Sequence, residues 1–236
     1  MYTQSAEYYD LIYGEFKDYP HEVQQISEMI RIHHPGAQAI LDMACGTGNH
    51  AKLLYQYFGF SVDGLDLDPN MVRIAARKHP EGRFRCADMS DDPGAEQYDV
   101  VLCLFSSIGY LKTLERVTAA LNCFRSHLRP GGITIVEPWF TPETAQPLYF
   151  DMQTVSKSDL KICRMGYTVS RKRMSRVKFQ YLINSREGIR HKSEIHELGL
   201  FTIEEMQHCF QEAGFEIWYD PQGFNNRGIY IGKRGQ

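Results

Sequence analysis

Three carboxylates and a glycine turn carry the most specific chemistry in this chain. The apolar run Ile40-Leu41 ends in Asp42, and the turn Gly46-Thr47-Gly48 follows before a helical pattern begins. Glycine has no Cβ and tolerates positive φ, so a ligand can approach the backbone closely at such a turn. A second apolar stretch ends in Asp66, and Asp88 follows a third, shorter one. A carboxylate at the end of the second strand can accept hydrogen bonds from both hydroxyls of a ribose.

The turn differs from the common phosphate-binding loops. Lys52 and Leu53 stand where the dinucleotide pattern needs its last glycine, and the Gly-Lys-Ser/Thr of a phosphate loop is absent. The carboxylate of Asp42 would repel a phosphate and would suit a ligand that carries a positive group. A single acid in such a place is as readily a helix cap or a turn residue. Three acids at successive strand ends favour a ligand site.

Together these residues resemble the class I S-adenosylmethionine-dependent methyltransferases. The resemblance implies that Asp42, Gly46 and Gly48 hold the methionine end of the cofactor. It also implies that Asp66 holds the ribose and that Asp88 bonds the adenine amino group. A Tyr-Asp-x-x-Tyr segment covers the cofactor in many of these enzymes and is matched by residues 9–13, although the same aromatics could simply pack a helix against the sheet. The other residues that we expect to contact S-adenosylmethionine are Tyr13, Ala44, Met89 and Phe105.

Strand and helix patterns alternate through most of the chain. This alternation predicts an α/β fold with a doubly wound, mostly parallel seven-stranded sheet, the Rossmann-like methyltransferase fold. Ligands bind beyond the carboxyl ends of the strands in such sheets, so the glycine turn, the acids, residues 105–107 and residues 137–139 should border one cleft. Helices are expected at 51–58, 68–78, 114–128 and 201–213, and strands at 40–42, 61–66, 83–87, 98–105, 133–138, 215–219 and 228–232.

The pattern changes in the second half of the chain. Residues 161–169, 175–183 and 190–198 alternate between polar and apolar side chains and are separated by turn-like links. Such alternation is typical of antiparallel strands with one face wet or facing a cleft. We therefore expect a single methyltransferase domain over residues 1–236, with an antiparallel β-meander insertion at about 155–198.

Charge is uneven between this insertion and the remainder. Residues 157–192 hold eleven Lys/Arg and two Asp/Glu, a balance of +9, whereas the rest of the chain holds 15 and 27, a balance of −12. Three interpretations are open: a solvated sheet face, a surface that meets an anionic substrate together with Arg227, and a nucleic-acid platform. The acidic remainder argues against the last, and we expect no nucleic-acid partner.

Composition agrees with a cytoplasmic enzyme. The chain has 236 residues, is 43% hydrophobic and carries a net charge of −3, which permits one α/β domain with a substantial core. No apolar run is long enough to cross a membrane, and the N-terminus lacks the features of a signal peptide. The six cysteines are scattered without a Cys-x-x-Cys pair, so neither a metal site nor a disulfide framework is expected.

Longer strings are similar to the sugar N,N-dimethyltransferases that finish deoxyamino sugars on a thymidine diphosphate carrier. Residues 44–48, 105–109, 136–139 and 226–228 are among the matching strings. One departure is Tyr110, since those enzymes carry a histidine after Ser-Ser-Ile-Gly. The N-terminal aromatic that lies near the substrate in that family falls on Tyr2. The resemblance implies that Tyr110 and Tyr2 are catalytic, and that the substrate-binding residues are Ser107, Glu137, Trp139 and Arg227.

The expected function is S-adenosylmethionine-dependent N-methylation of a small molecule, an amino group of a nucleotide-linked deoxyamino sugar. The sulfonium already activates the methyl group, so orientation and desolvation of a neutral amine can supply most of the rate. Tyr110 either accepts or orients an amine proton or merely lines the pocket. The alternatives are N- or C-methylation of another natural-product scaffold, and a cofactor-binding protein without turnover. A homodimer is compatible with the sequence, which does not reveal the oligomeric state.

Overall fold

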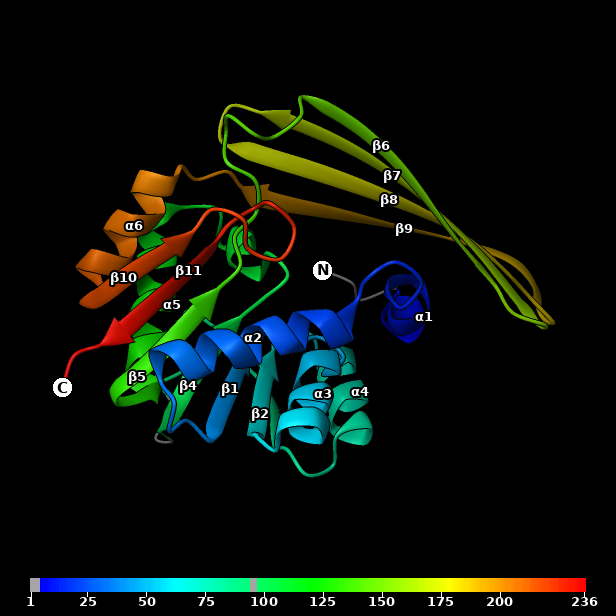
Figure 1. The fold of residues 1–236 in the computed structure, drawn as a ribbon. Helices are drawn as coiled ribbons and strands as arrows, with labels where there is room; N and C mark the ends of the chain where they lie inside the picture. The colour runs from blue at the N-terminus through cyan, green and yellow to red at the C-terminus, as the bar shows by residue number, and fades with distance from the viewer. Residues whose placement is uncertain (1–4, 94–96) are drawn as a thin grey trace.

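A seven-stranded sheet forms the centre of the computed structural model, which describes residues 5–93 and 97–236 (Figure 1). The strand order is β10-β11-β5-β4-β1-β2-β3. All neighbours from β5 to β3 pair in parallel, whereas β11 runs antiparallel to both β5 and β10. The predicted fold is therefore confirmed. The strands are β1 (Ala39–Met43), β2 (Ser61–Asp66), β3 (Phe84–Cys86), β4 (Tyr98–Cys103), β5 (Leu128–Val136), β10 (Phe215–Asp220) and β11 (Ile229–Arg234).

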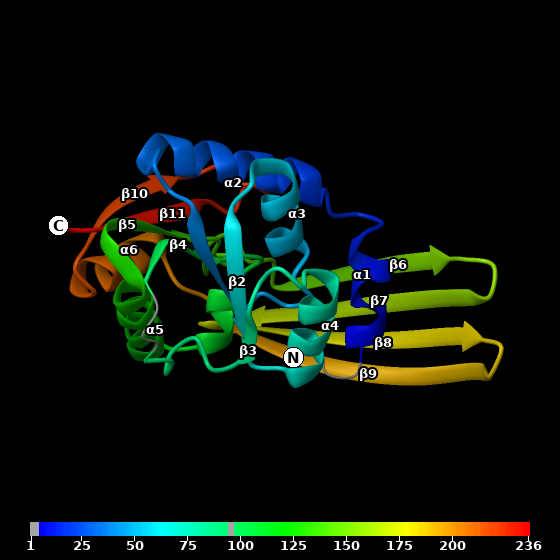
Figure 2. The same ribbon diagram turned by 90° about the horizontal axis from the view of Figure 1, so that it is seen from below.

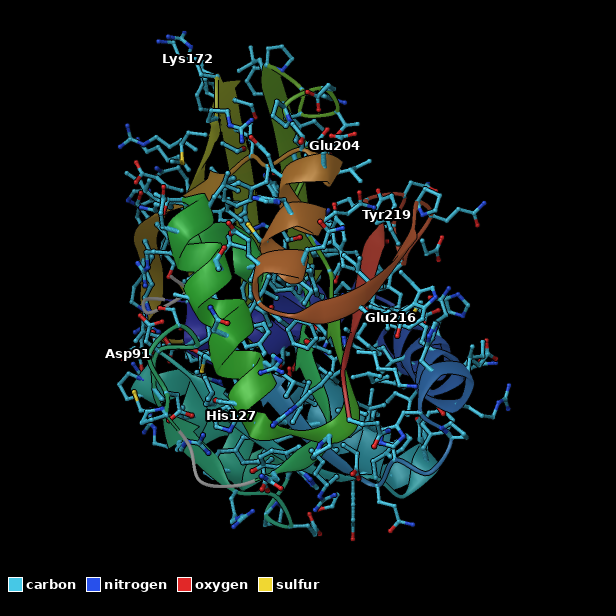
Figure 3. The ribbon with its side chains drawn as sticks, turned by 90° about the vertical axis from the view of Figure 1, so that its left-hand side faces the viewer. Asp91, His127, Lys172, Glu204, Glu216 and Tyr219 are labelled. Carbon is cyan, nitrogen blue, oxygen red and sulfur yellow. The ribbon has the colours of Figure 1, made fainter. Side chains whose placement is uncertain are left out.

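Helices bury both faces of this sheet, because successive strand residues point to opposite sides. On β1, Ile40 belongs to the core under α2 and α3, whereas Leu41 belongs to the core under α5 and α6. Figure 2 shows α2 and α5 on opposite sides of the sheet, and Figure 3 looks onto α5 and α6, which lie side by side. The helices are α2 (Tyr19–His33), α3 (Asn49–Phe58), α4 (Pro69–Lys78), α5 (Leu114–His127) and α6 (Ile203–Glu212).

A second sheet of four antiparallel strands projects from the first (Figure 1). It consists of β6 (Leu148–Ser156), β7 (Leu160–Arg171), β8 (Met174–Ser185) and β9 (Gly188–Gly199). The sequence predicted three of these strands and missed β6. The reason is that only Val155 of β6 is buried, whereas its apolar residues Phe150 and Met152 are exposed, so no buried apolar face marks this strand in the sequence.

The inner face of the second sheet packs against the N-terminal segment and the loop after β4. Phe179 and Tyr181 of β8 share an apolar cluster with Tyr8, Tyr110 and Trp139. The short helices η1 (Ala6–Tyr8), α1 (Tyr9–Tyr13) and η2 (Ser107–Leu111) lie at this junction. The antiparallel sheet thus covers the carboxyl ends of the parallel strands. Within the described ranges, no helix is both long and apolar enough to span a membrane.

Candidate active site

A pocket of about 1060 Å³ opens at the carboxyl ends of β1, β2 and β4. Its floor is the glycine turn and the residues after those strands, and its roof is the inner face of β6 to β9. This is the edge at which parallel sheets bind ligands, because the loops that connect strand to helix diverge there. The pocket is long enough to join the three predicted acids to the antiparallel sheet.

The glycine turn and Asp42 form the deepest wall. Gly46 and Gly48 have φ angles of +55° and +75°, which only glycine adopts readily. A Cβ on Gly46 would meet open space, whereas one on Gly48 would lie 3.0 Å from the Cβ of Ala75 on α4. Gly46 therefore leaves the pocket clear, and Gly48 instead allows the helices to pack.

Asp42 is 2% exposed, and among the described residues no donor reaches its Oδ2. Burial, together with the nearby charge of Asp66, raises the pKa of Asp42 to about 8. A buried carboxyl oxygen without a partner is costly, and a positively charged ligand would favour its ionised form. This observation fits the ammonium and sulfonium groups of S-adenosylmethionine.

Asp66 and Asp88 continue the same wall. Asp66 accepts hydrogen bonds from the backbone N–H of Gly46 at 2.9 Å and of Asp68 at 2.9 Å, which hold its carboxylate at the turn. Burial raises its pKa. Asp88 pairs with Arg116 at 3.0 Å and accepts from the Ser90 hydroxyl at 2.7 Å. Burial opposes ionisation of Asp88, but these hydrogen bonds outweigh it and lower its pKa.

The N-terminal segment is tied to the glycine turn by Asp10. Its carboxylate accepts from the Thr47 hydroxyl at 2.6 Å and from the Asn49 amide at 2.9 Å, and it pairs with Lys78 at 2.7 Å. The ring of Tyr13, one helical turn later, meets the Phe105 ring edge-on with centroids 5.3 Å apart. Tyr13 and Phe105 thereby cover the pocket from the side of α1.

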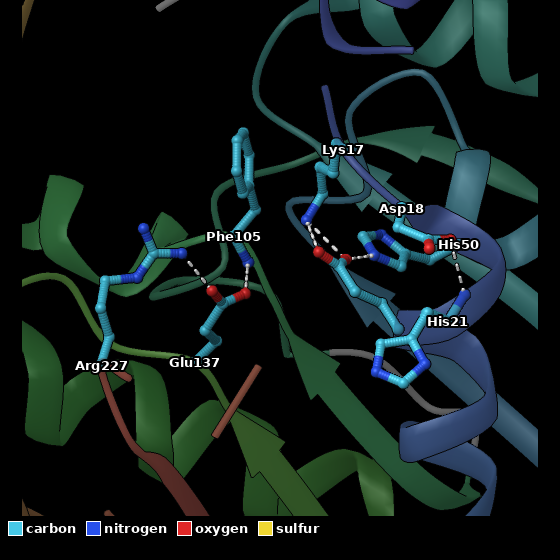
Figure 4. Close-up of polar contacts among 8 residues, drawn as sticks. Lys17, Asp18, His21, His50, Phe105, Glu137 and Arg227 are labelled. Atoms are coloured by element: carbon cyan, nitrogen blue, oxygen red, sulfur yellow. Dashed lines mark hydrogen bonds and ion pairs between the residues drawn. The ribbon is translucent and has the colours of Figure 1, made fainter. Parts of the chain in front are cut away.

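Two buried carboxylates support this cover from below (Figure 4). Glu22 bonds both Lys17 and His50, and Lys17 in turn lies over the Phe105 ring at 4.3 Å. Glu137 accepts from the backbone N–H of Phe105 at 2.6 Å. Phe105 has a φ of +52°, a conformation that costs ~1–3 kcal/mol in a residue with a Cβ. The bond from Glu137 helps to hold Phe105 in this strained geometry.

The far end of the pocket is lined by cations and aromatics. Arg227 is ion-paired with Glu137, and its guanidinium lies 5.6 Å from the centre of the Trp139 ring. The indole Nε1 of Trp139 is buried and has no hydrogen-bond partner among the described residues. Arg164 of β7 pairs with Asp151 of β6 at 2.8 Å in the same region.

Tyr110 and His196 meet at the pocket wall. The Tyr110 hydroxyl lies 2.7 Å from Nδ1 of His196, which β9 contributes from 86 residues further along the chain. An imidazole thus lies beside Tyr110, the residue that stands where the resemblance implies a histidine.

Most of the predicted site residues line this one pocket. They are Tyr13, Asp42, Ala44, Gly46, Asp66, Asp88, Met89, Phe105, Ser107, Tyr110, Trp139 and Arg227. Gly48 and Glu137, which were also predicted, do not themselves line the pocket: Gly48 packs against α4, and Glu137 is buried behind the wall, 1% exposed. Tyr2 lies outside the described residues.

The site residues predicted from the sequence did not include Asp10, Thr47, Asn49, Arg164 or His196, which lie at or beside the pocket. A signal for His196 existed, because strand periodicity places Glu194, His196 and Leu198 on one face of β9. Of the eleven cations in residues 157–192, only Arg164 lines the pocket. Several of the others form surface ion pairs, as Lys157 does with Glu15 and Arg186 with Asp159. The solvated-face interpretation therefore accounts for most of that charge.

Within residues 5–93 and 97–236, no three His, Cys, Asp or Glu side chains gather as a metal site would require. Independence from metals stays a prediction.

Known proteins share both the sequence and the fold. Residues 40–132 match a family described as a methyltransferase domain. The chain is 36% identical to the dTDP-3-amino-3,6-dideoxy-α-D-glucopyranose N,N-dimethyltransferase of Streptomyces fradiae, over 98% of this chain and 91% of that one. Its fold matches the crystal structure of DesVI from Streptomyces venezuelae with a TM-score of 0.91 at 34% identity, covering 98% of each chain.

A third match bears on the cofactor. An amino pentose methyltransferase from Micromonospora echinaspora, solved with S-adenosylmethionine bound, matches with a TM-score of 0.84 at 31% identity, over 94% of this chain and 93% of that one. The pocket, its acids and these similarities agree. The chain belongs to the S-adenosylmethionine-dependent methyltransferases, in the family of the sugar N,N-dimethyltransferases.

Proposed function

We propose that the acceptor of this methyltransferase is the amino group of a nucleotide-linked deoxyamino sugar. The observation that carries the proposal is the length of the pocket. It continues past Asp42, Asp66 and Asp88 to a second region under the antiparallel sheet, lined by Trp139, Arg164 and Arg227. Relatives that act on dTDP-amino sugars align with nearly the whole chain, including this sheet.

The residues of the pocket would do three things in the reaction. Asp42, Asp66 and Asp88 would bind S-adenosylmethionine, which supplies a methyl group already activated by its positive sulfur. Tyr13 and Phe105 would exclude water from the reacting atoms. The wall formed by Tyr110 would orient the amine. Well-oriented reactants reach effective molarities of ~10⁵–10⁸ M, so no strong base is needed for a neutral amine.

Arg227 is the proposed contact for the anionic part of the acceptor. One nitrogen of its guanidinium is held by Glu137, and its Nε has no hydrogen-bond partner among the described residues. The Trp139 ring supports the guanidinium from one side. A guanidinium fixed in this way can offer its remaining N–H groups to a phosphate without first losing side-chain entropy.

The direct test compares three acceptors with the purified enzyme. A dTDP-linked amino sugar, the same amino sugar without the nucleotide, and an unrelated small alkylamine are each incubated with S-adenosylmethionine, and products are identified by mass spectrometry. We expect methylation of the first, with kcat/KM at least tenfold above that of the second. Equal kcat/KM for all three acceptors would show that the enzyme does not recognise the nucleotide. Binding of S-adenosylmethionine without methylation of any acceptor would favour a non-catalytic protein.

We further propose that the protein forms a homodimer. The outer face of the antiparallel sheet exposes Phe150, Met152, Met165, Tyr167 and Leu182, each between 48% and 64% exposed. Phe150 pairs with Tyr167 and Met152 with Met165 across β6 and β7, so the patch is continuous. A contiguous apolar patch on a sheet face is typical of a protein interface.

A further inference from the structure

The contact between Tyr110 and His196 joins two elements that meet only at the pocket. Tyr110 belongs to η2, after the fourth parallel strand, and His196 to β9 of the antiparallel sheet. The Tyr110 hydroxyl and Nδ1 of His196 are 2.7 Å apart, and both residues line the pocket. His196 is 1% exposed, whereas Tyr110 is partly exposed. The Tyr110 hydroxyl thus contacts a buried imidazole, on a residue that borders the pocket.

The surroundings of His196 decide which of its nitrogens carries the proton. Its Nε2 lies 3.7 Å from Oε2 of Glu194, within ion-pair range but beyond hydrogen-bond distance, and that carboxylate oxygen accepts from the Ser5 and Tyr181 hydroxyls. The Phe179 ring of β8 packs edge-on at 5.4 Å, and Arg164 of β7 is a nearby cation among the described residues. Burial lowers the pKa of His196, and Glu194 opposes that effect only in part. The ring is therefore neutral near pH 7, and we assign its single proton to Nε2, on the side of the Glu194 carboxylate, which leaves Nδ1 as an acceptor.

This tautomer determines what the Tyr110 hydroxyl offers to the pocket. A phenol has one proton, and once that proton is donated to Nδ1 only oxygen lone pairs remain. An amine in the pocket then donates an N–H to Tyr110 and keeps its own lone pair free. With the opposite polarity, the hydroxyl proton would bond to the amine lone pair and block the nucleophile.

We propose that His196 is a positioning residue that makes Tyr110 an acceptor-only group, so that the enzyme takes only amines with at least one N–H. The inference rests on the proposed function, because it assumes an amine acceptor. Primary and secondary amines meet the requirement. A tertiary amine does not, so methylation stops before a quaternary ammonium forms. Protonation of His196 places a proton on Nδ1 and reverses the polarity of the bond.

Three variants separate this role from simple packing. His196→Leu removes the acceptor, and we expect kcat to fall at least tenfold, up to the ~10²-fold typical of a lost proton-handling group, with little change in KM. His196→Asn places an amide oxygen near the position of Nδ1 and cannot be protonated. We expect the wild type to lose kcat at low pH, as His196 becomes protonated, and we expect His196→Asn to recover most of kcat without this loss. Tyr110→Phe should be no more impaired after His196→Leu is added, because the two residues act as one unit.

His191→Leu is the matched control, since His191 lies on the same strand but is exposed and bonds Gln180. We expect His191→Leu to have the kcat and the pH dependence of the wild type. The proposal is overturned if His196→Leu keeps full kcat, or if His196→Asn keeps the wild-type fall at low pH.

A readout without acceptor separates this inference from the proposed function. Nitrogen NMR of the resting protein at pH 7.5 should show Nε2 of His196 protonated and Nδ1 bare, with the Nδ1 signal shifting in Tyr110→Phe. A protonated Nδ1 would contradict the inference about His196, even if the enzyme methylates an amino sugar. If the expected tautomer is found but the enzyme methylates no amine, the proposed acceptor is wrong instead.

Discussion

Asp42 is the buried pocket carboxyl whose ionisation we expect cofactor binding to change. Its pKa of about 8 means that it is largely protonated at neutral pH in the ligand-free protein. A cationic ligand favours the ionised form, so binding of S-adenosylmethionine should release a proton near pH 7. Calorimetry in two buffers with different ionisation enthalpies should therefore give different apparent binding heats. Asp42→Asn should abolish the difference and weaken binding by ~1–3 kcal/mol; identical heats for the wild type in both buffers would contradict the assignment.

The same carboxyl links stability to pH. Its folded pKa lies above the unfolded value of about 3.9, so the folded state binds the proton more tightly. The contribution of this proton to the free energy of unfolding is complete below pH 4. It is lost progressively as the pH rises toward 8. We therefore expect Asp42→Asn to raise the Tm of the ligand-free protein at pH 8 more than at pH 5. Scanning calorimetry of both proteins at the two pH values checks this. A Tm of Asp42→Asn below that of the wild type at pH 8 would contradict the prediction.

Arg227 also acts at the scale of the residue, but it must be tested together with its partner. Removing Arg227 alone leaves Glu137 as an unpaired buried charge, which costs ~3–5 kcal/mol and disturbs Phe105. We expect the double variant Arg227→Met/Glu137→Gln to raise the KM of a dTDP-amino sugar more than tenfold and to change cofactor affinity little. Arg186→Met, an exposed cation far along the antiparallel sheet, is the control. An unchanged KM in the double variant would remove Arg227 from substrate binding.

At the scale of the element, Asp10 joins α1 to the glycine turn and to α4. It contacts Thr47, Asn49 and Lys78, and Tyr13 covers the pocket from the same short helix. Five residues make too short a helix to be stable alone, so these contacts hold it in place. We expect Asp10→Asn to weaken S-adenosylmethionine binding by ~1–2 kcal/mol and to speed proteolysis near α1. Glu15→Gln, which breaks an exposed ion pair nearby, should do neither. Equal cofactor affinity and equal proteolysis rates in the two variants would show that Asp10 does not hold α1 in place.

At the scale of the whole molecule, the exposed face of the antiparallel sheet predicts self-association. Met152→Lys combined with Met165→Lys places two like charges in neighbouring positions of the patch. We expect light scattering to show a dimer for the wild type and a monomer for this variant. Lys161→Glu, also on β7 but outside the apolar patch, should leave the dimer intact. A wild-type monomer at tens of micromolar would overturn the dimer.

The sequence by itself determined the parallel sheet, the glycine turn and the three acids. These features are local: Asp42 lies near the end of β1, Asp66 ends β2, and Asp88 stands two residues after β3. The central strand β4 is buried along its whole length, as a strand covered on both faces should be. Parallel strands align their carboxyl ends, which brings Asp42, Asp66 and Asp88 to one pocket without further information.

Only the tertiary structure decided how the second sheet meets that pocket. Strand β6 lacks a buried apolar face, because its apolar residues Phe150 and Met152 are exposed, and its pairing depends on β7. Glu137 could not be recognised as a support for Phe105 and Arg227, since both contacts cross to other elements. His196 contacts Tyr110 because β9 packs over the loop after β4. The two residues are 86 positions apart, so their spacing in the sequence does not indicate this contact. Contacts between distant elements depend on packing rather than on local pattern, and the chemistry of the acceptor side depends on such contacts.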